Sequence, residues 1–180
     1  MVVWGAELLM LMLSRRQYRL EERGGVMFVL ASDSLPCPVC TSTLYAIGRR
    51  YRKVTSTSGQ KRSLMIRRLR CSNVKCRRIH HELPDIVVPY KRHCSQTIQN
   101  VIEGSLESVP LESTVIWRIR LWWRRVEIYF ANILEALAAR IGVQIPERPS
   151  FRDRIQAAVN GNSWIFAGAQ SGVAFQPVRQ

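Results

Sequence analysis

The chain has 180 residues and carries 27 Lys and Arg against 13 Asp and Glu, for a formal net charge of +14. This length allows one or two small cores and excludes a large catalytic domain. Fourteen of the basic residues but only two acidic residues lie within residues 49–93, so this segment is the expected surface for a polyanionic partner.

Residues 1–34 are interpreted as an N-terminal extension that could be adventitious. Their first 13 residues are apolar but lack the basic start and the small-residue cleavage site of a signal peptide. A short packing helix is the alternative for this stretch. Residues 26–30 are typical of a strand, and Met27 could be a truer start. No run of 18 apolar residues is present, so we expect a soluble, cytoplasmic protein with no membrane partner.

Two cysteine pairs, Cys37-x2-Cys40 and Cys71-x4-Cys76, lie thirty residues apart. Such pairs predict a four-ligand zinc site, with one structural zinc per chain and no open coordination position. Disulfides would need an oxidising compartment, which no secretion signal supports. Because x4 is longer than the usual x2, His80 or His81 could replace Cys71 or Cys76 as a ligand. Cys94 is expected to be a free thiol.

Between the cysteine pairs, residues 44–54 and 62–71 are rich in strand-forming residues, and residues 55–60 have a turn composition. This pattern predicts a β-hairpin that joins the two cysteine turns. Residues 35–92 would then form a zinc ribbon with a proline-containing connector at its end.

A helical segment is expected over residues 93–165. Ser95 is a candidate N-cap for a short helix that ends at Gly104, and a long amphipathic helix is predicted from residue 113 to about residue 140. Its apolar stripe is Ile119, Trp122, Trp123, Val126, Phe130, Ile133, Leu134, Leu137 and Ile141. Ser150 and Asp153 form a candidate capping box for a helix over residues 151–159. Residues 166–180 are expected to be a flexible tail, although Trp164, Phe166 and Phe175 could dock back.

The expected fold class is therefore α+β, with a small β-hairpin zinc ribbon followed by a helix-turn-helix-like domain. Ser113, Thr114 and Arg118 lie at the start of the long helix, where a recognition helix would contact DNA. A solvated basic face explains the arginines at the start of this helix nearly as well. Ile119, Val126 and Ile133 are spaced by seven residues, a pattern that permits a homodimer through the long helix.

The candidate nucleic-acid-binding residues are the bases of the hairpin and connector together with the start of the long helix. They are Arg49, Arg50, Arg52, Lys53, Arg67, Arg68, Arg70, Arg77, Arg78, Lys91, Arg92, Ser113, Thr114 and Arg118. Arginine suits bidentate contacts with phosphate and guanine. Tyr45 and Tyr51 on the hairpin could stack on unpaired bases.

The motifs CPVC (37–40), IRRLRC (66–71), RRIHHELPD (77–85), VPYKR (88–92) and ESTVIWR (112–118) form an ordered set. As a set they resemble a Gram-positive bacterial family of uncharacterised proteins that joins a zinc ribbon to a helix-turn-helix-like segment, similar to the N-terminal regions of insertion-sequence transposases. The resemblance covers residues 35–165, and the x4 spacing of the second cysteine pair departs from it. It implies DNA binding linked to mobile elements, without catalysis.

The sequence thus predicts a zinc-dependent DNA-binding protein with a transposon-associated accessory or regulatory role. Duplex DNA is the expected partner. RNA or single-strand binding, or a protein–protein interaction module, is the alternative. An enzyme is not expected, because a transposase would need an acidic metal-binding trio on a large core.

Overall fold

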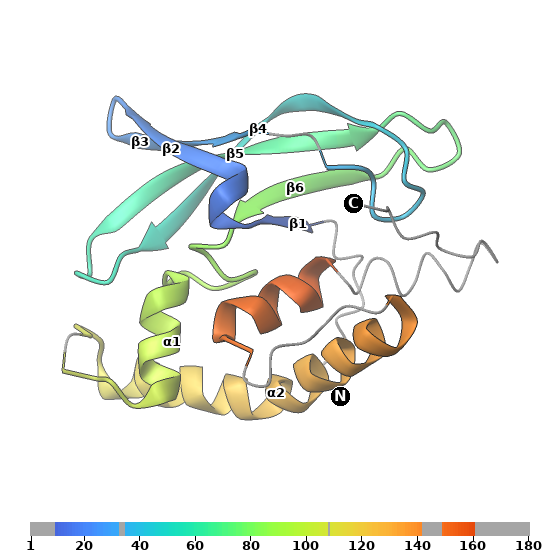
Figure 1. The fold of residues 1–180 in the computed structure, drawn as a ribbon. Helices are drawn as coiled ribbons and strands as arrows, with labels where there is room; N and C mark the ends of the chain where they lie inside the picture. The colour runs from blue at the N-terminus through green and yellow to red at the C-terminus, as the bar shows by residue number, and fades with distance from the viewer. Residues whose placement is uncertain (1–9, 33–34, 108, 142–148, 161–180) are drawn as a thin grey trace.

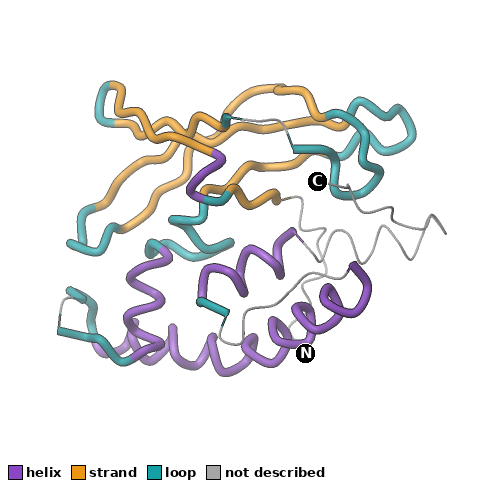
Figure 2. The backbone as a smooth tube through the Cα atoms, viewed as in Figure 1, coloured by secondary structure: helices purple, strands orange, loops and turns teal. Residues whose placement is uncertain are grey.

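A computed structural model describes residues 10–32, 35–107, 109–141 and 149–160. Six strands and three helices follow one another within these described residues, and Figures 1 and 2 show their arrangement. The strands are β1 (Met10–Leu13), β2 (Tyr18–Arg23), β3 (Val26–Ala31), β4 (Leu44–Thr55), β5 (Lys61–Cys71) and β6 (Ile79–Pro84). The helices are α1 (Ser95–Glu103), α2 (Ser113–Ile141) and a further helix over residues 151–160, and a short 3-10 turn, Arg15–Gln17, precedes β2.

All six strands belong to one curled, mixed sheet in the order β1-β6-β5-β3-β2, with β4 on the other edge of β5. β5 is its central strand. Along one edge β5 pairs with β4 over its whole length, and along the other edge it pairs first with β3 and then with β6. The β1–β6 and β3–β5 pairs are parallel and the others are antiparallel. Sharing one edge between two strands lets the sheet curl.

The predicted fold class is wrong. The β4–β5 hairpin has the expected bounds to within one residue, but its second strand, β5, is the centre of a six-stranded sheet and not part of a separate zinc ribbon. Residues 10–31, which the sequence analysis treated as an extension, supply three strands of that sheet. Pairing between β3 and β5 joins segments that are far apart in the chain, and no local sequence pattern predicts such a pairing. The expected boundaries between the extension, the ribbon, the helical segment and the tail stay predictions.

The helices cover one face of the sheet (Figure 1). Their main core joins the apolar stripe of α2 to residues 151–160, and Met12 and Val88 contribute from the sheet side. A second core fills the curl of the sheet, with Tyr18, Val29, Val54, Leu64, Ile66 and Leu83 buried in it. A third, small core surrounds the cysteine turns.

Most of the expected α2 stripe is in this core, where Trp123 packs its ring against Phe130 and Phe151. The predicted helix-turn-helix domain is absent from the described residues, because α1, α2 and residues 151–160 pack as one layer against the sheet. Ile119, Val126 and Ile133 are buried inside the chain, so a homodimer through α2 would have to use another face. The side chains of Leu137 and Ile141 and residues 161–180, including Trp164, Phe166 and Phe175, lie outside the described residues.

Three helix ends can be compared with their predictions. α1 ends at Gly104, whose left-handed φ of 85° is the expected stop signal. Its N-cap is Cys94 and not Ser95. The capping box before residues 151–160 is confirmed: the Asp153 backbone N–H donates to Ser150 Oγ, and the Ser150 backbone N–H donates to Asp153 Oδ2.

In the described part of the chain no helix combines the length and apolar character that a membrane span requires.

Candidate metal centre and basic groove

The two cysteine pairs are held on similar turns at one end of the sheet. Cys37 and Cys40 precede β4, and a backbone hydrogen bond of 2.8 Å from Thr41 N–H to the Cys37 carbonyl closes their turn. Cys71 is the last residue of β5, and Cys76 lies on the turn before β6. Each turn ends with a left-handed residue directly after its second cysteine, Thr41 (φ 59°) and Arg77 (φ 46°).

The longer x4 spacing of the second pair is absorbed by Asn73. Its carbonyl accepts hydrogen bonds from the backbone N–H groups of Cys76 and Arg77, at 3.0 and 2.9 Å, and its side chain accepts one from Lys75 N–H at 2.9 Å. This extra turn brings Cys76 back beside Cys71. The spacing that departs from the common pattern therefore still delivers both thiols to one place.

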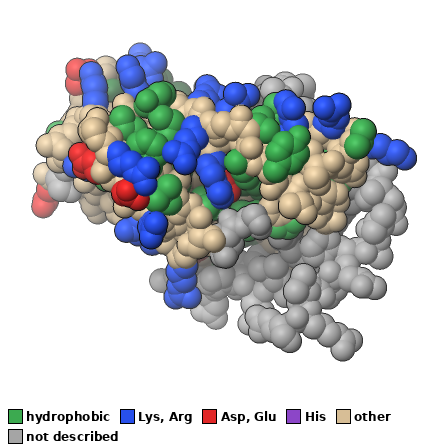
Figure 3. Space-filling model, turned by 90° about the horizontal axis from the view of Figure 1, so that it is seen from above, with side chains coloured by type: hydrophobic (Ala, Val, Ile, Leu, Met, Phe, Trp, Pro, Cys, Tyr) green, Lys and Arg blue, Asp and Glu red, His purple; other side chains and the backbone are tan. Residues whose placement is uncertain are grey.

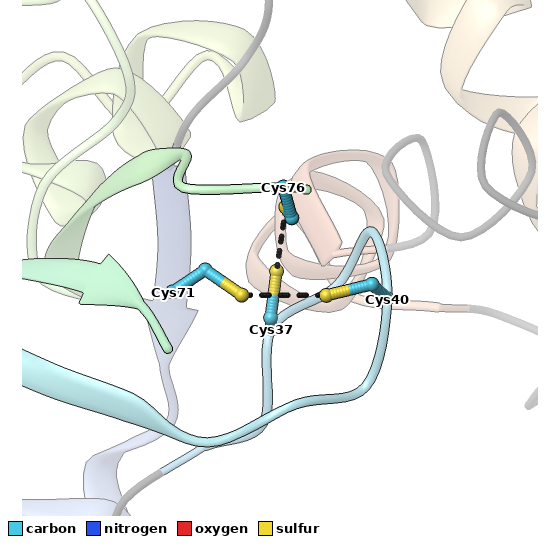
Figure 4. Close-up of side chains that lie close together, drawn as sticks. All are labelled: Cys37, Cys40, Cys71 and Cys76. Atoms are coloured by element: carbon cyan, nitrogen blue, oxygen red, sulfur yellow. Dashed lines mark hydrogen bonds between the residues drawn. The ribbon is translucent and has the colours of Figure 1, made fainter. Parts of the chain in front are cut away.

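The four thiols point toward one another (Figure 4). All four sulfur atoms lie within 4.8 Å of one another. The distance is 3.8 Å from Cys37 Sγ to Cys76 Sγ and 3.3 Å from Cys40 Sγ to Cys71 Sγ. Four sulfurs placed about 2.3 Å from a central ion at tetrahedral corners are about 3.8 Å apart. The cluster could thus hold one metal ion, and all four cysteines are free of disulfides.

Burial and hydrogen bonds together give the thiols of the cluster different pKa values. Burial raises the pKa of Cys37, and burial together with the hydrogen bond to Cys40 raises the pKa of Cys71. Burial also acts to raise the pKa of Cys40, but hydrogen bonds from Ser42 and neighbouring thiols outweigh it and lower that pKa to about 6. A metal ion must displace the remaining thiol protons, so metal affinity should fall as the pH falls.

His80 lies beside the cluster and not within it. It is fully buried, and its Nε2 is 3.5 Å from Cys37 Sγ. Burial, then the positive charge of Arg78 and the neighbouring His81, lowers the pKa of His80 to about 4, so the ring is neutral at physiological pH. In this position its N–H can donate to a Cys37 thiolate. Cys94 stands apart and contacts Thr97 Oγ1 at 3.1 Å.

A second feature is a groove of about 570 Å³ on the helix side of the β4–β5 hairpin. We call it the basic groove. Among the described residues that line it none is acidic, and its charged side chains are Arg50, Arg52, Lys53, Lys61 and Arg92. Tyr51, His81 and Tyr90 also line it. Burial and the nearby charges of Arg50 and Arg68 lower the pKa of His81, as expected in a positive environment.

Arg52 fixes one wall of the basic groove. Its Nη2 donates to the carbonyls of Val88 and Lys91 at 2.6 and 3.0 Å, which holds the connector before α1 against β4. The Thr55 N–H adds a 2.7 Å hydrogen bond to the Arg92 carbonyl. Tyr90 and Arg92 are thereby kept opposite the edge strand.

The other predicted nucleic-acid-binding residues are spread over the molecule. Arg67 is bonded to the buried Glu82, and the Lys91 ammonium lies 4.1 Å from the ring centroid of Trp122. Those outside the groove lining are Arg49, Arg67, Arg68, Arg70, Arg77, Arg78, Lys91, Ser113, Thr114 and Arg118. Sequence reasoning missed Lys61, His81 and Tyr90 as groove residues. Lys61 pairs with Thr55 within the hairpin, and the fold brings His81 and Tyr90 to β4.

Residues 37–119 match a domain of unknown function (DUF6431). The match covers the four cysteines, β4, β5, β6, α1 and the start of α2. Comparison with curated proteins and with solved structures gives no match. The matched domain does not connect the chain with transposases or with Gram-positive bacteria, so that resemblance stays a prediction.

Proposed function

We propose that the protein binds nucleic acid through the basic groove and that a structural zinc ion stabilises the sheet that forms it. The observation that carries this proposal is a groove of about 570 Å³ whose charged lining residues, among those described, are all cations. Phosphate backbones are the polyanions that such a surface attracts most strongly in cells. The concentration of basic residues in residues 49–93 supports the same conclusion.

Zinc would be held by Cys37, Cys40, Cys71 and Cys76. Four cysteine ligands form a closed structural site, so the ion would supply a cross-link and no open position for a substrate. That cross-link would join the turn before β4, the end of β5 and the turn before β6. We accordingly propose a binding role and not catalysis.

The groove suits a phosphate backbone because its cations are already positioned. Arg50 and Arg92 are exposed, so their guanidinium groups are available for bidentate phosphate contacts. The bonds from Arg52 and Thr55 order the connector before any ligand arrives. Less conformational entropy is then lost on binding.

The sequence resemblance adds the finer proposal of an accessory or regulatory role beside a mobile element, with duplex DNA as the partner. Contacts between the groove and phosphates do not need a helix in the major groove, because phosphate contacts fix position without reading bases. The finer role rests on the resemblance alone.

Binding of a labelled 20-base-pair duplex, measured by fluorescence anisotropy over a range of salt concentrations, tests the proposal. If about six phosphates are neutralised, log affinity should fall with log salt with a slope of about −5. The Arg50→Glu/Arg92→Glu variant should bind at least tenfold more weakly and with a shallower slope.

The matched control is Arg118→Glu, a charge reversal of an exposed arginine on α2 that lies outside the groove. It should retain most of the affinity. Equal losses in the groove variant and in this control would contradict the assignment to the groove, and salt-independent binding would contradict phosphate recognition.

A further inference from the structure

The sheet has a second face, turned away from the helices, which Figure 3 shows from above. Hydrophobic side chains gather there among Lys and Arg side chains, with few Asp and Glu. Most of a sheet face that is not covered by another layer is expected to be polar. An exposed aromatic side chain and half-buried apolar neighbours surrounded by cations therefore require an explanation.

Strand register identifies the apolar residues at the middle of this face. Phe28 on β3 pairs with Met65 on β5, and Met65 pairs with Tyr51 on β4. The three residues therefore lie side by side across three neighbouring strands. We call them the stacking row.

Alternation along the strands places the stacking row on the outer face. Leu64 and Ile66 flank Met65 and are buried in the core on the helix side, so Met65 points to the opposite side. By the same alternation Tyr51 lies opposite Arg52, which bonds to the connector on the helix side. Tyr51 is 64% exposed.

The contacts of Phe28 confirm the arrangement. The guanidinium carbons of Arg23 and Arg49 each lie 5.2 Å from its ring centroid. Arg49 is two residues from Tyr51 on the same face of β4. Aromatic rings and guanidinium planes next to one another form a flat surface on which bases can stack.

Cations border this surface on both sides. Arg19, Arg49 and Lys53 are exposed and belong to the outer face by strand alternation, although Lys53, on the edge strand β4, also lines the basic groove. The carboxylates of Glu21 and Glu82 are each bonded to an arginine, Arg23 and Arg67. A strand whose bases rest on the row would thus have cations within reach of its phosphates.

We propose that the outer face binds single-stranded nucleic acid, with bases stacked on Phe28, Met65 and Tyr51 and phosphates held by Arg19, Arg49 and Lys53. The inference deepens the proposed nucleic-acid function by naming a substrate class and a second contact surface, which meets the basic groove at Tyr51 and Lys53. A duplex does not fit this chemistry, because its bases are stacked on one another and cannot reach exposed rings. Every base has a π-face, so binding should tolerate many sequences.

The test compares three labelled ligands by anisotropy: a 12-nucleotide oligo-dT, a 12-nucleotide oligo-U and a 20-base-pair duplex. Tyr51→Ala should weaken binding of both single strands by about tenfold, the scale of one lost base–aromatic stack. Tyr51→Phe keeps the ring and should bind within about twofold of wild type. Tyr51 also lines the basic groove, but its side chain is uncharged, so duplex affinity, which rests on phosphate contacts, should hardly change in either variant.

Tyr45→Ala is the matched control. Tyr45 is an exposed tyrosine on the same strand, but its partner Arg70 belongs to the opposite face of β5. This variant should bind single strands as wild type does. Oligo-dT and oligo-U distinguish DNA from RNA: similar affinities indicate recognition of bases and phosphates, and a preference for oligo-U indicates contacts with the 2′-hydroxyl.

Unchanged single-strand binding by Tyr51→Ala, or equal losses in Tyr51→Ala and Tyr45→Ala, would overturn this inference while leaving the duplex-binding function intact. Absence of binding to all three ligands would overturn both proposals. Loss of single-strand binding in Tyr51→Ala with retention in Tyr51→Phe is the supporting result.

Discussion

Asn160 and Met12 join the last described helix to the first described strand, although 148 positions separate them. The Met12 backbone N–H donates to Asn160 Oδ1 at 2.9 Å, and Asn160 Nδ2 donates back to the Met12 carbonyl at 3.1 Å. At Met12, the Asn160 side chain thus makes the hydrogen bonds that the backbone of a neighbouring strand would make. The segment before β2 is in this way tied to the helical layer.

Replacing this side chain should destabilise the whole fold. Asn160→Ala leaves the N–H and carbonyl of the buried Met12 without these partners, so the free energy of unfolding should fall by about 1–3 kcal/mol. Urea denaturation measures the change. Gln99→Ala is the control, because it removes an exposed hydrogen bond within α1 and should cost far less.

Arg67 and Glu82 form a bidentate ion pair, with N···O distances of 2.5 and 2.9 Å, in which the Glu82 side chain is 1% exposed. Arg67→Ala leaves this carboxylate buried without its cation and should lower the free energy of unfolding by about 3 kcal/mol. The Arg67→Met/Glu82→Leu variant should recover much of that loss. Arg62→Ala, a change at an exposed residue of the same strand, is the control. Arg67→Ala with the same stability as Arg62→Ala would contradict the importance of the pair.

The Tyr18 hydroxyl donates to Asp85 Oδ1 at 2.6 Å. Burial, then the hydrogen bond and the charge of Asp85, raises the pKa of Tyr18 well above its ordinary value of about 10. The unfolded chain therefore loses this proton at a lower pH than the folded chain does. Below about pH 10 the protonated Tyr18 hydroxyl makes its full contribution to the free energy of unfolding, and this contribution is lost as the pH rises further.

Comparing wild type with Tyr18→Phe from pH 8 to 11 tests this coupling. The free energy of unfolding of wild type should fall more steeply above about pH 10 than that of Tyr18→Phe. Both proteins should be loaded with the same metal. Parallel pH profiles would show that Tyr18 does not keep its proton in the folded state.

Local signals made part of the structure predictable. The turn composition around Gly59 and the strand-forming residues on either side predicted the β4–β5 hairpin, and Gly104 marked the end of α1. The Ser150–Asp153 capping box was readable because both partners lie within one helical turn. The cysteine spacing predicted that four thiols lie together, and the fold does bring them together.

Interactions between distant segments were not predictable. Arg52 and Arg67 look like surface arginines in the sequence, but each is bonded to a group brought near by the fold. The stacking row requires that β3 pair with β5 in parallel. The alternation of polar and apolar residues within either strand cannot predict that pairing. The same limit explains the wrong fold class, since the ribbon was expected to end where its local pattern ended.

We propose that the four-cysteine cluster holds a zinc ion on which the sheet depends. Native mass spectrometry of the purified protein, with elemental analysis of the bound metal, tests it most directly. We predict one zinc per chain in wild type and in Cys94→Ser, loss of the metal in Cys40→Ser and Cys76→Ser, and unfolding of wild type when a chelator removes the ion. A folded wild-type protein without metal, or zinc retained in Cys40→Ser and Cys76→Ser, would contradict it.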